Sequence, residues 1–390
     1  MSEVIYLDNA STTRISQDVI DAMIPYLNNF YNPSSIYTSA QNIRSKINEC
    51  REFIANTLNA YNSEIFFTSG GSESNNWAIK SVADTFSNKG KHIITSKIEH
   101  HSILNTTKYL EYHGYEITYL NVDSGGFINL NELKKSIRDD TILVSIMYAN
   151  NEIGTIEPIE EIGQICHDNG TLFHTDAVQA YCHIPIDVRK SNIDLLSVSA
   201  HKFGGPKGIG FLYKKSNIPL IPLIHGGDQE MNKRAGTENV AGIIGMTKAA
   251  EIAYPSITER SNREILLRDH CIKRILTEIP YSRLNGDRVK RLSNNINISF
   301  QFVEGESILL YLNKYGICAS SGSACTSNSL DPSHVLLAIG LPHEIAHGSL
   351  RLTISHETNM NEINYTIERL KEVIQKLRSM SPLYDDFIKM

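Results

Sequence analysis

One stretch of the chain decides the fold, and it reads Asp194-Leu195-Leu196-Ser197-Val198-Ser199-Ala200-His201-Lys202-Phe203-Gly204-Gly205. Its first half is apolar enough to be a strand buried on both faces, whereas its second half is polar and ends in glycines. In open α/β proteins, ligands bind at the carboxyl ends of the strands. The stretch therefore predicts a buried strand that leads directly into a binding site containing Lys202.

Similar strands lie on both sides of this stretch in the sequence. Between about residues 60 and 215, short apolar runs alternate with helix-like segments, and the other runs are Ile65–Thr68, His92–Ser96, Ile142–Met147, Leu172–Asp176 and Gly208–Tyr213. Nearly continuous apolar strands separated by helices are typical of a mainly parallel sheet covered by helices. The sequence thus predicts an α/β fold with a large domain built on such a sheet.

The last third of the chain has a different pattern. Helix-like residues occupy 256–278, β-like stretches follow near Asn295–Phe300 and Arg351–Ser355, and apolar residues recur at spacings of three and four from Ile363 to Met380. We predict a large domain over 15–257 and a smaller α+β domain over 258–390. The N-terminal segment 1–14 is expected to pack with the smaller domain.

Composition excludes several classes of protein. Of the 390 residues, 41% are apolar and 21% are charged, and the net charge of −6 gives no basic excess for nucleic-acid binding. No apolar stretch approaches the roughly 20 residues that a membrane span needs. The six cysteines form no CxxC pair, which argues against a disulfide scaffold. Since the first residues do not resemble a signal peptide, we expect a cytoplasmic protein that does not bind membranes.

Two strand ends indicate a pyridoxal phosphate site. Lys202 can form a Schiff base with an aldehyde cofactor, and the neighbouring Ser199 and His201 could bind its phosphate. Asp176 ends the preceding strand, and a carboxylate there would keep the pyridine nitrogen protonated, as the cofactor requires. Gln179 could donate a hydrogen bond to the phenolic oxygen. The alternatives are a surface lysine and an aspartate that caps the next helix.

Three more strand ends carry polar groups. The segment Thr68–Asn76 includes Gly71 and Ser72 and opens a helix, whose free N–H groups and dipole suit a phosphate. The run Asn150–Gly154 follows another strand, and His100 follows a third, where its ring could stack on a pyridine. Gly/Ser turns before helices are common, and a lone histidine is more often structural. The prediction of a binding site therefore depends on the number of strands that end in polar groups.

Cys325 lies in an unusual segment, Ser320–Ser329, in which nearly every residue is small and polar. Such a segment predicts an exposed and mobile loop, from about 318 to 332, and an exposed thiol is a candidate nucleophile. The alternative is an incidental loop cysteine. Because an ordinary thiol with a pKa of ~8.5 is mostly protonated at pH 7, a base would be needed, and His100 is a candidate.

These segments, in this order, resemble the cysteine desulfurases of the class V aminotransferase family, including the NifS and IscS types. The resemblance rests on the segments Tyr6–Thr13, Asn32–Ser35, Thr68–Asn76, Asn150–Gly154, Asp176–Gln179, Ser199–Lys202, Arg234–Asn239 and Ser320–Ser327. It covers nearly the whole chain and implies a pyridoxal-phosphate-dependent transferase fold. It also implies that the enzyme removes sulfur from L-cysteine, leaving L-alanine and a persulfide on Cys325.

The resemblance implies a role for each site residue. Lys202 would hold the cofactor and move protons, Asp176 would pair with the pyridinium, and His100 would stack over the ring. The phosphate would be held by Gly71, Ser72, Ser199 and His201, and by Thr237 of the neighbouring subunit of a homodimer. Asn151 and Gln179 would contact the cofactor oxygen and the substrate, and Arg351 would bind the substrate carboxylate.

The resemblance also implies a sulfur acceptor, an iron–sulfur scaffold protein or another acceptor protein. No metal site is expected within the chain, although Cys325 would meet an iron–sulfur cluster transiently. Nitrogenase maturation, housekeeping clusters and tRNA thiolation all stay open as destinations. Some positions depart from the commonest pattern: Ser11 replaces alanine, Tyr148 replaces histidine, and Trp77 replaces an aliphatic residue. The run Leu352–Glu357 also stands where glycine-containing sequences are common.

Three rival functions remain at this point. A transaminase of the same fold would not need a cysteine in a small polar loop, and a selenocysteine lyase would not use cysteine. A catalytically inactive scaffold would not need Lys202, Asp176 and Cys325 together. The sequence therefore favours a cysteine desulfurase over a transaminase and over an inactive scaffold, whereas the relative activity on selenocysteine stays open.

Overall fold

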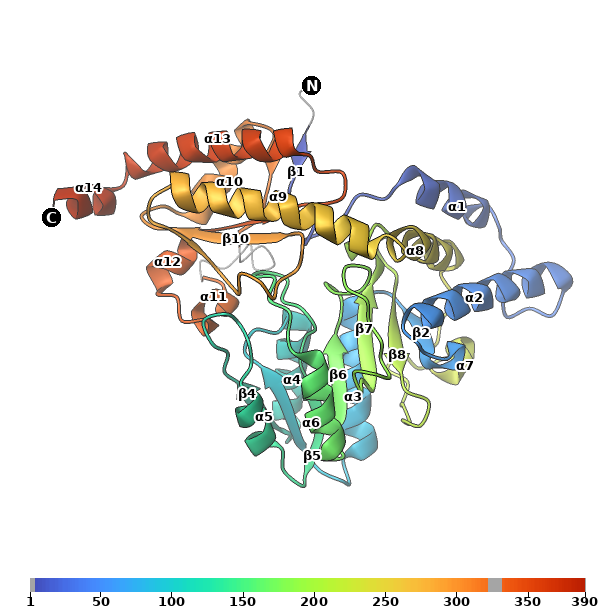
Figure 1. Cartoon of the computed structure of the whole chain (residues 1–390). Coiled ribbons are helices and arrows are strands. Elements are labelled where there is room, and N and C mark those ends of the chain that lie inside the picture. Colours follow the sequence, from blue (N-terminus) through green and yellow to red (C-terminus); the bar gives the residue numbers. More distant parts are fainter. Residues whose placement is uncertain (1–3, 322–331, 390) are drawn as a thin grey trace.

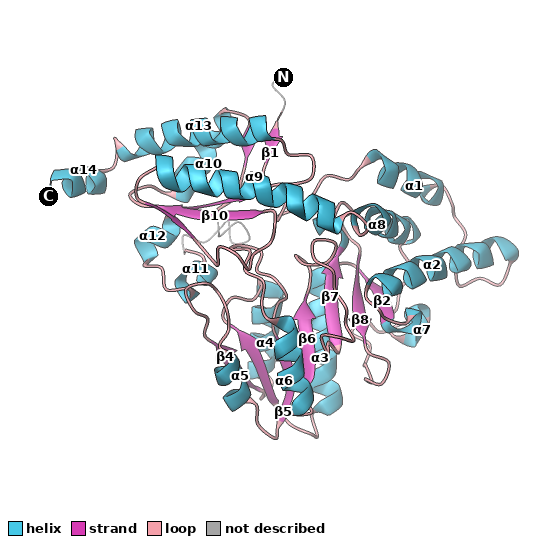
Figure 2. Ribbon diagram, in the orientation of Figure 1, coloured by secondary structure: helices cyan, strands magenta, loops and turns pink. Residues whose placement is uncertain are grey.

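The computed structural model describes residues 4–321 and 332–389 (Figure 1). A seven-stranded sheet with helices on both sides forms the lower part of the molecule in this view, and a smaller sheet covered by long helices lies above it (Figure 2). The first described residues lie beside the upper part, and the last helix extends outward from that upper part (Figure 1). This arrangement confirms the predicted α/β fold with a smaller C-terminal part.

The large sheet has the strand order β2-β8-β7-β6-β5-β3-β4, and β8 alone among these strands runs against the others. The strands are β2 (Ile65–Thr68), β3 (His92–Ser96), β4 (Glu116–Leu120), β5 (Thr141–Ser145), β6 (Leu172–Asp176), β7 (Leu195–Ser199) and β8 (Gly210–Lys214). Every predicted strand is present, with shifts of up to two residues at β5 and β8. The sequence pattern missed β4, because this edge strand is partly exposed and lacks a continuous apolar run.

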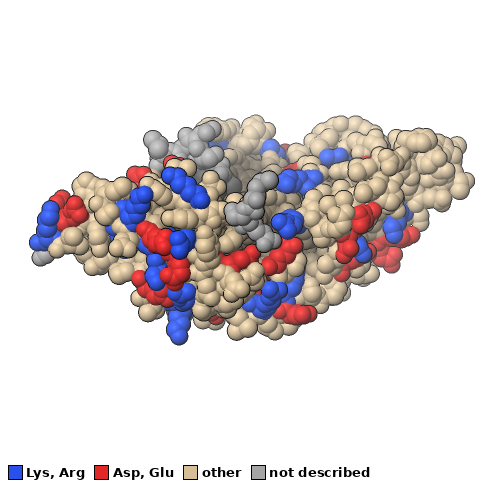
Figure 3. Space-filling model, turned by 90° about the horizontal axis from the view of Figure 1, so that it is seen from above, with Lys and Arg blue, Asp and Glu red and all other residues tan. Residues whose placement is uncertain are grey.

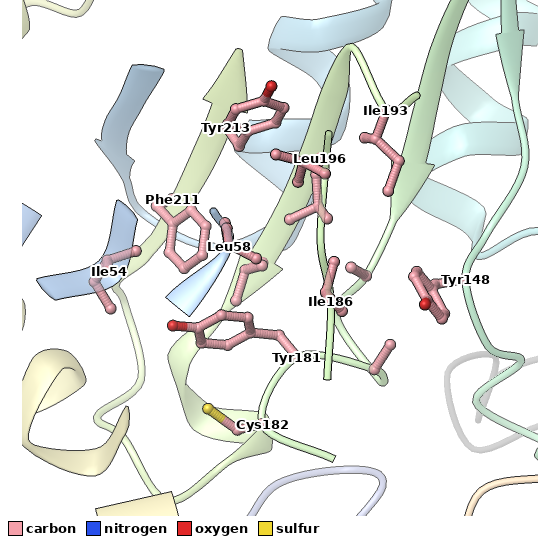
Figure 4. Close-up of a cluster of buried hydrophobic side chains, with 14 of the residues drawn as sticks. Ile54, Leu58, Tyr148, Tyr181, Cys182, Ile186, Ile193, Leu196, Phe211 and Tyr213 are labelled. Carbon is pink, nitrogen blue, oxygen red and sulfur yellow. The ribbon is translucent and has the colours of Figure 1, made fainter. Parts of the chain in front are cut away.

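Helices cover the sheet and its flank. They are α1 (Gln17–Leu27), α2 (Thr38–Thr57), α3 (Gly71–Phe86), α4 (His101–Tyr112), α5 (Leu130–Ser136), α6 (Ile159–Asp168), α7 (Gln229–Asn232) and α8 (Val240–Ala253), with the 3-10 turns η1 (Asn62–Glu64) and η2 (Ala200–Lys202). In Figure 4, Leu196 of β7 and Phe211 of β8 pack with Ile54 of α2 and with Tyr181. This apolar packing fixes the strands whose ends carry the polar groups predicted above.

The C-terminal part has its own apolar core. Its elements are α9 (Ile257–Glu278), β9 (Ser282–Leu284), β10 (Asn295–Phe300), α10 (Gly305–Lys314), β11 (Ile317–Cys318), α11 (His334–Ala338), α12 (His343–His347), β12 (Ser349–Thr353), α13 (Met360–Arg378) and α14 (Pro382–Lys389). Asn359 and Glu362 form the predicted capping box of α13. The first strand, β1 (Ile5–Tyr6), pairs with β11, and Leu7 belongs to this core. The N-terminal segment thus contacts the C-terminal part, while the division into two domains stays a prediction.

One face of the molecule carries charged side chains of both signs. On the face seen in Figure 3, basic and acidic side chains are interspersed, so this face offers no continuous basic surface for a nucleic-acid backbone. Within residues 4–321 and 332–389, no helix combines the length and apolar content needed to cross a membrane.

A buried ion pair ties α2 to α7 and β2. The guanidinium of Arg51 makes two hydrogen bonds of 2.7 Å to the Glu230 carboxylate, which also accepts from the backbone N–H of Phe67 at 2.8 Å. Both side chains are at least nine-tenths buried. A surface cavity of about 730 Å³ lies beside this pair, but the residues that line it do not include Lys202.

Replacing Glu230 with alanine is expected to lower the free energy of unfolding by about 3–5 kcal/mol, because Arg51 would stay buried without a partner. Denaturant unfolding followed by circular dichroism would measure the change. The matched control is Glu49→Ala, which breaks an exposed pair with Lys46 and should cost less than about 1 kcal/mol. Equal losses in the two variants would contradict the prediction.

Candidate active site

The polar strand ends meet in one cavity of about 350 Å³ at the carboxyl edge of the large sheet. The lining includes ten of the residues singled out in the sequence, namely Gly71, Ser72, His100, Asn151, Asp176, Gln179, Ser199, His201, Lys202 and Arg351. Nine of them come from the large sheet and its loops, whereas Arg351 comes from β12. The two sheets thus both contribute to the cavity, and the site depends on how they pack.

Lys202 is held by the N-terminal segment. It ends η2, directly after β7, and its Nζ donates to the backbone oxygens of Ala10 at 2.7 Å and Ser11 at 2.8 Å. The side-chain amide of Gln179 donates to the same Ala10 oxygen at 3.0 Å. Residues near the start of the chain therefore form one wall of the cavity, and they place the lysine amine inside it.

Asp176, the last residue of β6, is buried and oriented on both of its oxygens. Its Oδ1 accepts from the backbone N–H of Val178 at 2.9 Å, and its Oδ2 accepts from the side-chain amide of Asn75 at 2.7 Å. Asp176 is therefore a fixed acceptor in the cavity, suited to pair with a protonated ring nitrogen.

The N-terminus of α3 forms another part of the wall. A side chain at Gly71 would place its Cβ 2.6 Å from Val178 Cγ2, so only glycine fits there. Within the described residues, no hydrogen bond satisfies the backbone N–H of Gly71 or Ser72. Burial lowers the pKa of His201 to about 4, so this ring is neutral at pH 7. Open N–H groups at a helix start, together with Ser199 and His201, suit a phosphate group.

Arg351 is nearly fully buried and bridges the two sheets. Its guanidinium donates to Asp8 Oδ1 at 3.0 Å, to Ser11 Oγ at 2.8 Å and to the backbone oxygen of Asn151 at 3.0 Å. Its Nε, also buried, has no partner among the described residues. Arginine has five N–H donors, and three are used here, so donors remain for a substrate carboxylate.

Ser11 has a role that its sequence position did not reveal. Its hydroxyl donates to Asp8 Oδ1 at 2.8 Å while it accepts from Arg351. An alanine at this position, as in the commonest pattern, could make neither bond. The serine that replaces the usual alanine therefore adds a hydrogen-bond partner for Arg351.

His100 lies at the start of α4 and serves as its N-cap. Its Nδ1 accepts from the backbone N–H of Ser102 at 3.1 Å and lies 2.8 Å from the Ser102 hydroxyl. Burial lowers the pKa of His100, and the nearby Asp176 carboxylate opposes that shift. The ring next to it, His101, stacks on His334 of α11 with centroids 4.8 Å apart.

One described site residue is not in this cavity, and another predicted site residue is not described. Thr237 lies on the exposed loop between α7 and α8 and is not among the lining residues, so a role for it depends on a second subunit. Cys325 lies outside the described residues. The segment that contains it is bounded by Ser320, which pairs with Arg351, and by Ser333, whose hydroxyl donates to Glu152 at 2.5 Å.

Sequence reasoning gave no role to Asn75 and Ser102, which contact Asp176 and His100. Asn75 follows Gly71 by one helical turn, and residues four apart share a helix face. That spacing was a usable signal for Asn75 once Gly71 was placed at the cavity. Ser102 had no such signal, because its contact with Asn75 joins two different helices.

The residues present fit pyridoxal phosphate. The cavity offers a primary amine for its aldehyde, an oriented carboxylate for its ring nitrogen, and a helix start for its phosphate. A cluster of donors without the amine would suit many anions, but the three groups together match three different parts of this cofactor. The cavity is also large enough to hold a small amino acid beside it.

Comparison with known proteins agrees with this geometry. The family model described as aminotransferase class-V matches residues 5–366. A cysteine desulfurase IscS of Methanosarcina thermophila is 54% identical over 384 residues, which cover 98% of this chain and 95% of the relative. Another IscS, from Clostridium botulinum strain Hall, is 52% identical over 392 residues, covering 100% and 99%.

Solved structures are similar over nearly the same length. A structure titled NifS-like protein superposes with a TM-score of 0.90 at 37% identity, covering 96% of this chain and all of that one. A structure titled "SspA in complex with cysteine" gives a TM-score of 0.81 at 38% identity, covering 91% and 100%. Sequence, fold and site geometry agree: the chain belongs to the class-V aminotransferase family.

Proposed function

We propose that this chain is a pyridoxal-phosphate-dependent cysteine desulfurase that passes the sulfur of L-cysteine to Cys325 and releases L-alanine. The observation that carries the proposal is the meeting of Lys202, Asp176 and Arg351 in one cavity. Relatives that are 52–54% identical and named cysteine desulfurase support it, as does a structural neighbour solved with cysteine.

Each part of the cofactor has a proposed partner in the cavity. Lys202 would bind the aldehyde, Asp176 would pair with the ring nitrogen, and His100 would cover the ring. Gln179 and Asn151 would contact the phenolic oxygen and the substrate, and the phosphate would be held by Gly71, Ser72, Ser199 and His201. When bound, the cofactor takes up the electrons left by removal of the substrate α-proton.

The chain's own groups perform the remaining chemistry. Arg351 binds the substrate carboxylate, and the Lys202 amine removes the α-proton and returns a proton to carbon. The Cys325 thiolate attacks the substrate sulfur, so that the C–S bond breaks and an S–S bond forms. Overall, L-cysteine and the Cys325 thiol give L-alanine and a persulfide on Cys325, and the atoms balance.

Partners follow from the same proposal. The exposed position of Thr237 is consistent with a homodimer in which this residue reaches the phosphate of the neighbouring subunit. The persulfide sulfur then passes to an acceptor protein in the cytoplasm, for iron–sulfur cluster assembly or another sulfur-containing product.

The test is a visible spectrum of the purified chain, with an assay of sulfide and alanine from L-cysteine in the presence of a thiol reductant. We expect a yellow protein and equal amounts of the two products. A yellow protein that releases no sulfide would move the chemistry to another amino acid or to selenocysteine. Consumption of an added oxo-acid would indicate a transaminase, and a colourless protein would contradict the cofactor.

Replacing Arg351 with lysine is expected to raise KM for L-cysteine by about 10- to 100-fold, with a much smaller change in kcat. The reason is that lysine keeps the charge but loses the planar donors that match a carboxylate. An interaction made equally in the ground and transition states affects KM more than kcat. Steady-state alanine formation as a function of cysteine concentration separates the two constants.

The matched control for this variant is Arg14→Lys. Arg14 lies three residues after Ser11, which contacts Arg351, but it is largely exposed. Among the described residues, its guanidinium forms an ion pair only with Glu357, at 3.6 Å. The Arg14→Lys variant should keep KM and kcat within about twofold of those of the unchanged chain. An unchanged KM in Arg351→Lys, with the visible spectrum intact, would remove Arg351 from substrate binding.

A further inference from the structure

His100 is fixed by the backbone of the helix that it caps. The N–H of Ser102 points to His100 Nδ1 at 3.1 Å. A backbone N–H can only donate, so Nδ1 must accept and cannot carry a proton in the neutral ring. The proton of neutral His100 therefore resides on Nε2. No hydrogen bond joins this Nε2 to another residue of the described part of the chain, and His100 lines the cavity.

A chain of hydrogen bonds supports the same arrangement. Asp176 is an acceptor, so the Asn75 amide group facing it at 2.7 Å must be the NH₂ group. The same NH₂ group donates to the Ser102 hydroxyl at 2.8 Å. That hydroxyl can then donate its own proton to His100 Nδ1, 2.8 Å away. Every donor along this path points from Asn75 toward His100.

Burial of the ring favours the neutral form of His100. Burial lowers its pKa, and the neighbouring His101 and the Lys202 charge act in the same direction, whereas Asp176 alone opposes them. A neutral ring with its proton on Nε2 presents a hydrogen-bond donor to the cavity. It has no acceptor nitrogen there, because its only lone pair is used within the helix start.

We propose that His100 acts in the reaction as a hydrogen-bond donor through Nε2, directed at the sulfur of the substrate or at the anion that forms there, and not as the base for the Cys325 thiol. Asn75 and Ser102 are positioning residues that hold this tautomer. The catalytic part of the inference rests on the proposed function, but the tautomer does not, because it follows from the contacts alone.

The tautomer is measured by NMR on the full chain with its cofactor bound and its histidine ring nitrogens labelled with ¹⁵N. Comparison with His100→Gln identifies the signals of His100 among those of the 14 histidines. We expect a proton on Nε2 and a shift typical of an acceptor at Nδ1, between pH 7 and 8. A proton on Nδ1, or a charged ring at pH 7, would overturn the proposal even in an active desulfurase.

Two substitutions test the role in the reaction. Glutamine places an amide donor near the position of Nε2 but cannot accept a proton, whereas leucine offers neither. If His100 donates, His100→Gln should keep kcat within about 10-fold, and His100→Leu should lose about 100-fold or more. A base would make both variants lose the same 10²–10⁴-fold, and that result would overturn the donor role. The visible spectrum of each variant is the check that it holds the cofactor.

Discussion

Replacing Lys202 with alanine is expected to lower kcat for sulfide and alanine formation by about 10⁴-fold. Among the described residues that line the cavity, Lys202 carries the only primary amine. Its loss removes both the covalent link to the cofactor aldehyde and the group that moves the α-proton. Arg351 also lines the cavity, but a guanidinium cannot replace the lysine amine as a base.

Two comparisons make this result specific. Lys207→Ala removes an exposed lysine of the same loop and should leave kcat within about twofold, since it lies outside the cavity lining. Adding a small primary amine such as ethylamine to Lys202→Ala should restore part of the rate, because the amine can enter the space left by the side chain. Near-normal turnover in Lys202→Ala would show that another group moves the proton.

The strands that position Lys202 were predictable because each one is buried on both faces. Leu195–Ser199 and Leu172–Asp176 have the predicted bounds: each strand begins with two apolar residues, and all of their residues except Leu172 are buried. Strand β4 was missed because its Glu116 is exposed and its neighbours are only half-buried. The direction of β8 was not predictable either, because strand patterns do not encode whether a neighbour is parallel or antiparallel.

The site was predictable to the extent that its residues follow strand ends. Asp176, Ser199 and Lys202 come from neighbouring strands of one sheet, so a parallel sheet brings them together without further information. The hydrogen-bond partners of Arg351 could not be predicted in this way. Its bonds to Asp8 and Ser11 span 343 and 340 residues of chain, and they depend on how the N-terminal segment meets β12. Only the resemblance suggested Arg351, and nothing local suggested its partners.

The hydrogen bonds between helices were the least predictable part. Asn75 and Ser102 lie on α3 and α4, which meet through side chains that no periodicity in either helix specifies. Both residues are ordinary helix-start residues when each helix is considered alone. Their role depends on the angle at which the two helices pack, and that angle is a property of the whole core.

Replacing Cys325 with alanine is expected to abolish sulfide release from L-cysteine, to below about one thousandth of the normal rate, while the yellow colour of the bound cofactor remains. The reason is chemical: the sulfur that leaves the substrate needs a thiolate to accept it, and alanine offers none. Lys202, Asp176 and Arg351 are unchanged in this variant, so cofactor and substrate should still bind. Binding of L-cysteine should therefore still change the visible spectrum, although turnover stops.

The control is Cys318→Ala, seven residues earlier, because this cysteine is half-buried in β11 beside the N-terminal strand. It should keep the normal rate within about twofold. Mass spectrometry after one turnover without reductant should find one added sulfur atom on Cys325 in the unchanged chain and in Cys318→Ala, and none in Cys325→Ala. Sulfide release by Cys325→Ala at a normal rate would mean that the substrate C–S bond breaks without a protein thiol. The chain would then be a lyase that eliminates sulfide directly, and Lys202 and Asp176 would keep their roles while Cys325 lost its own.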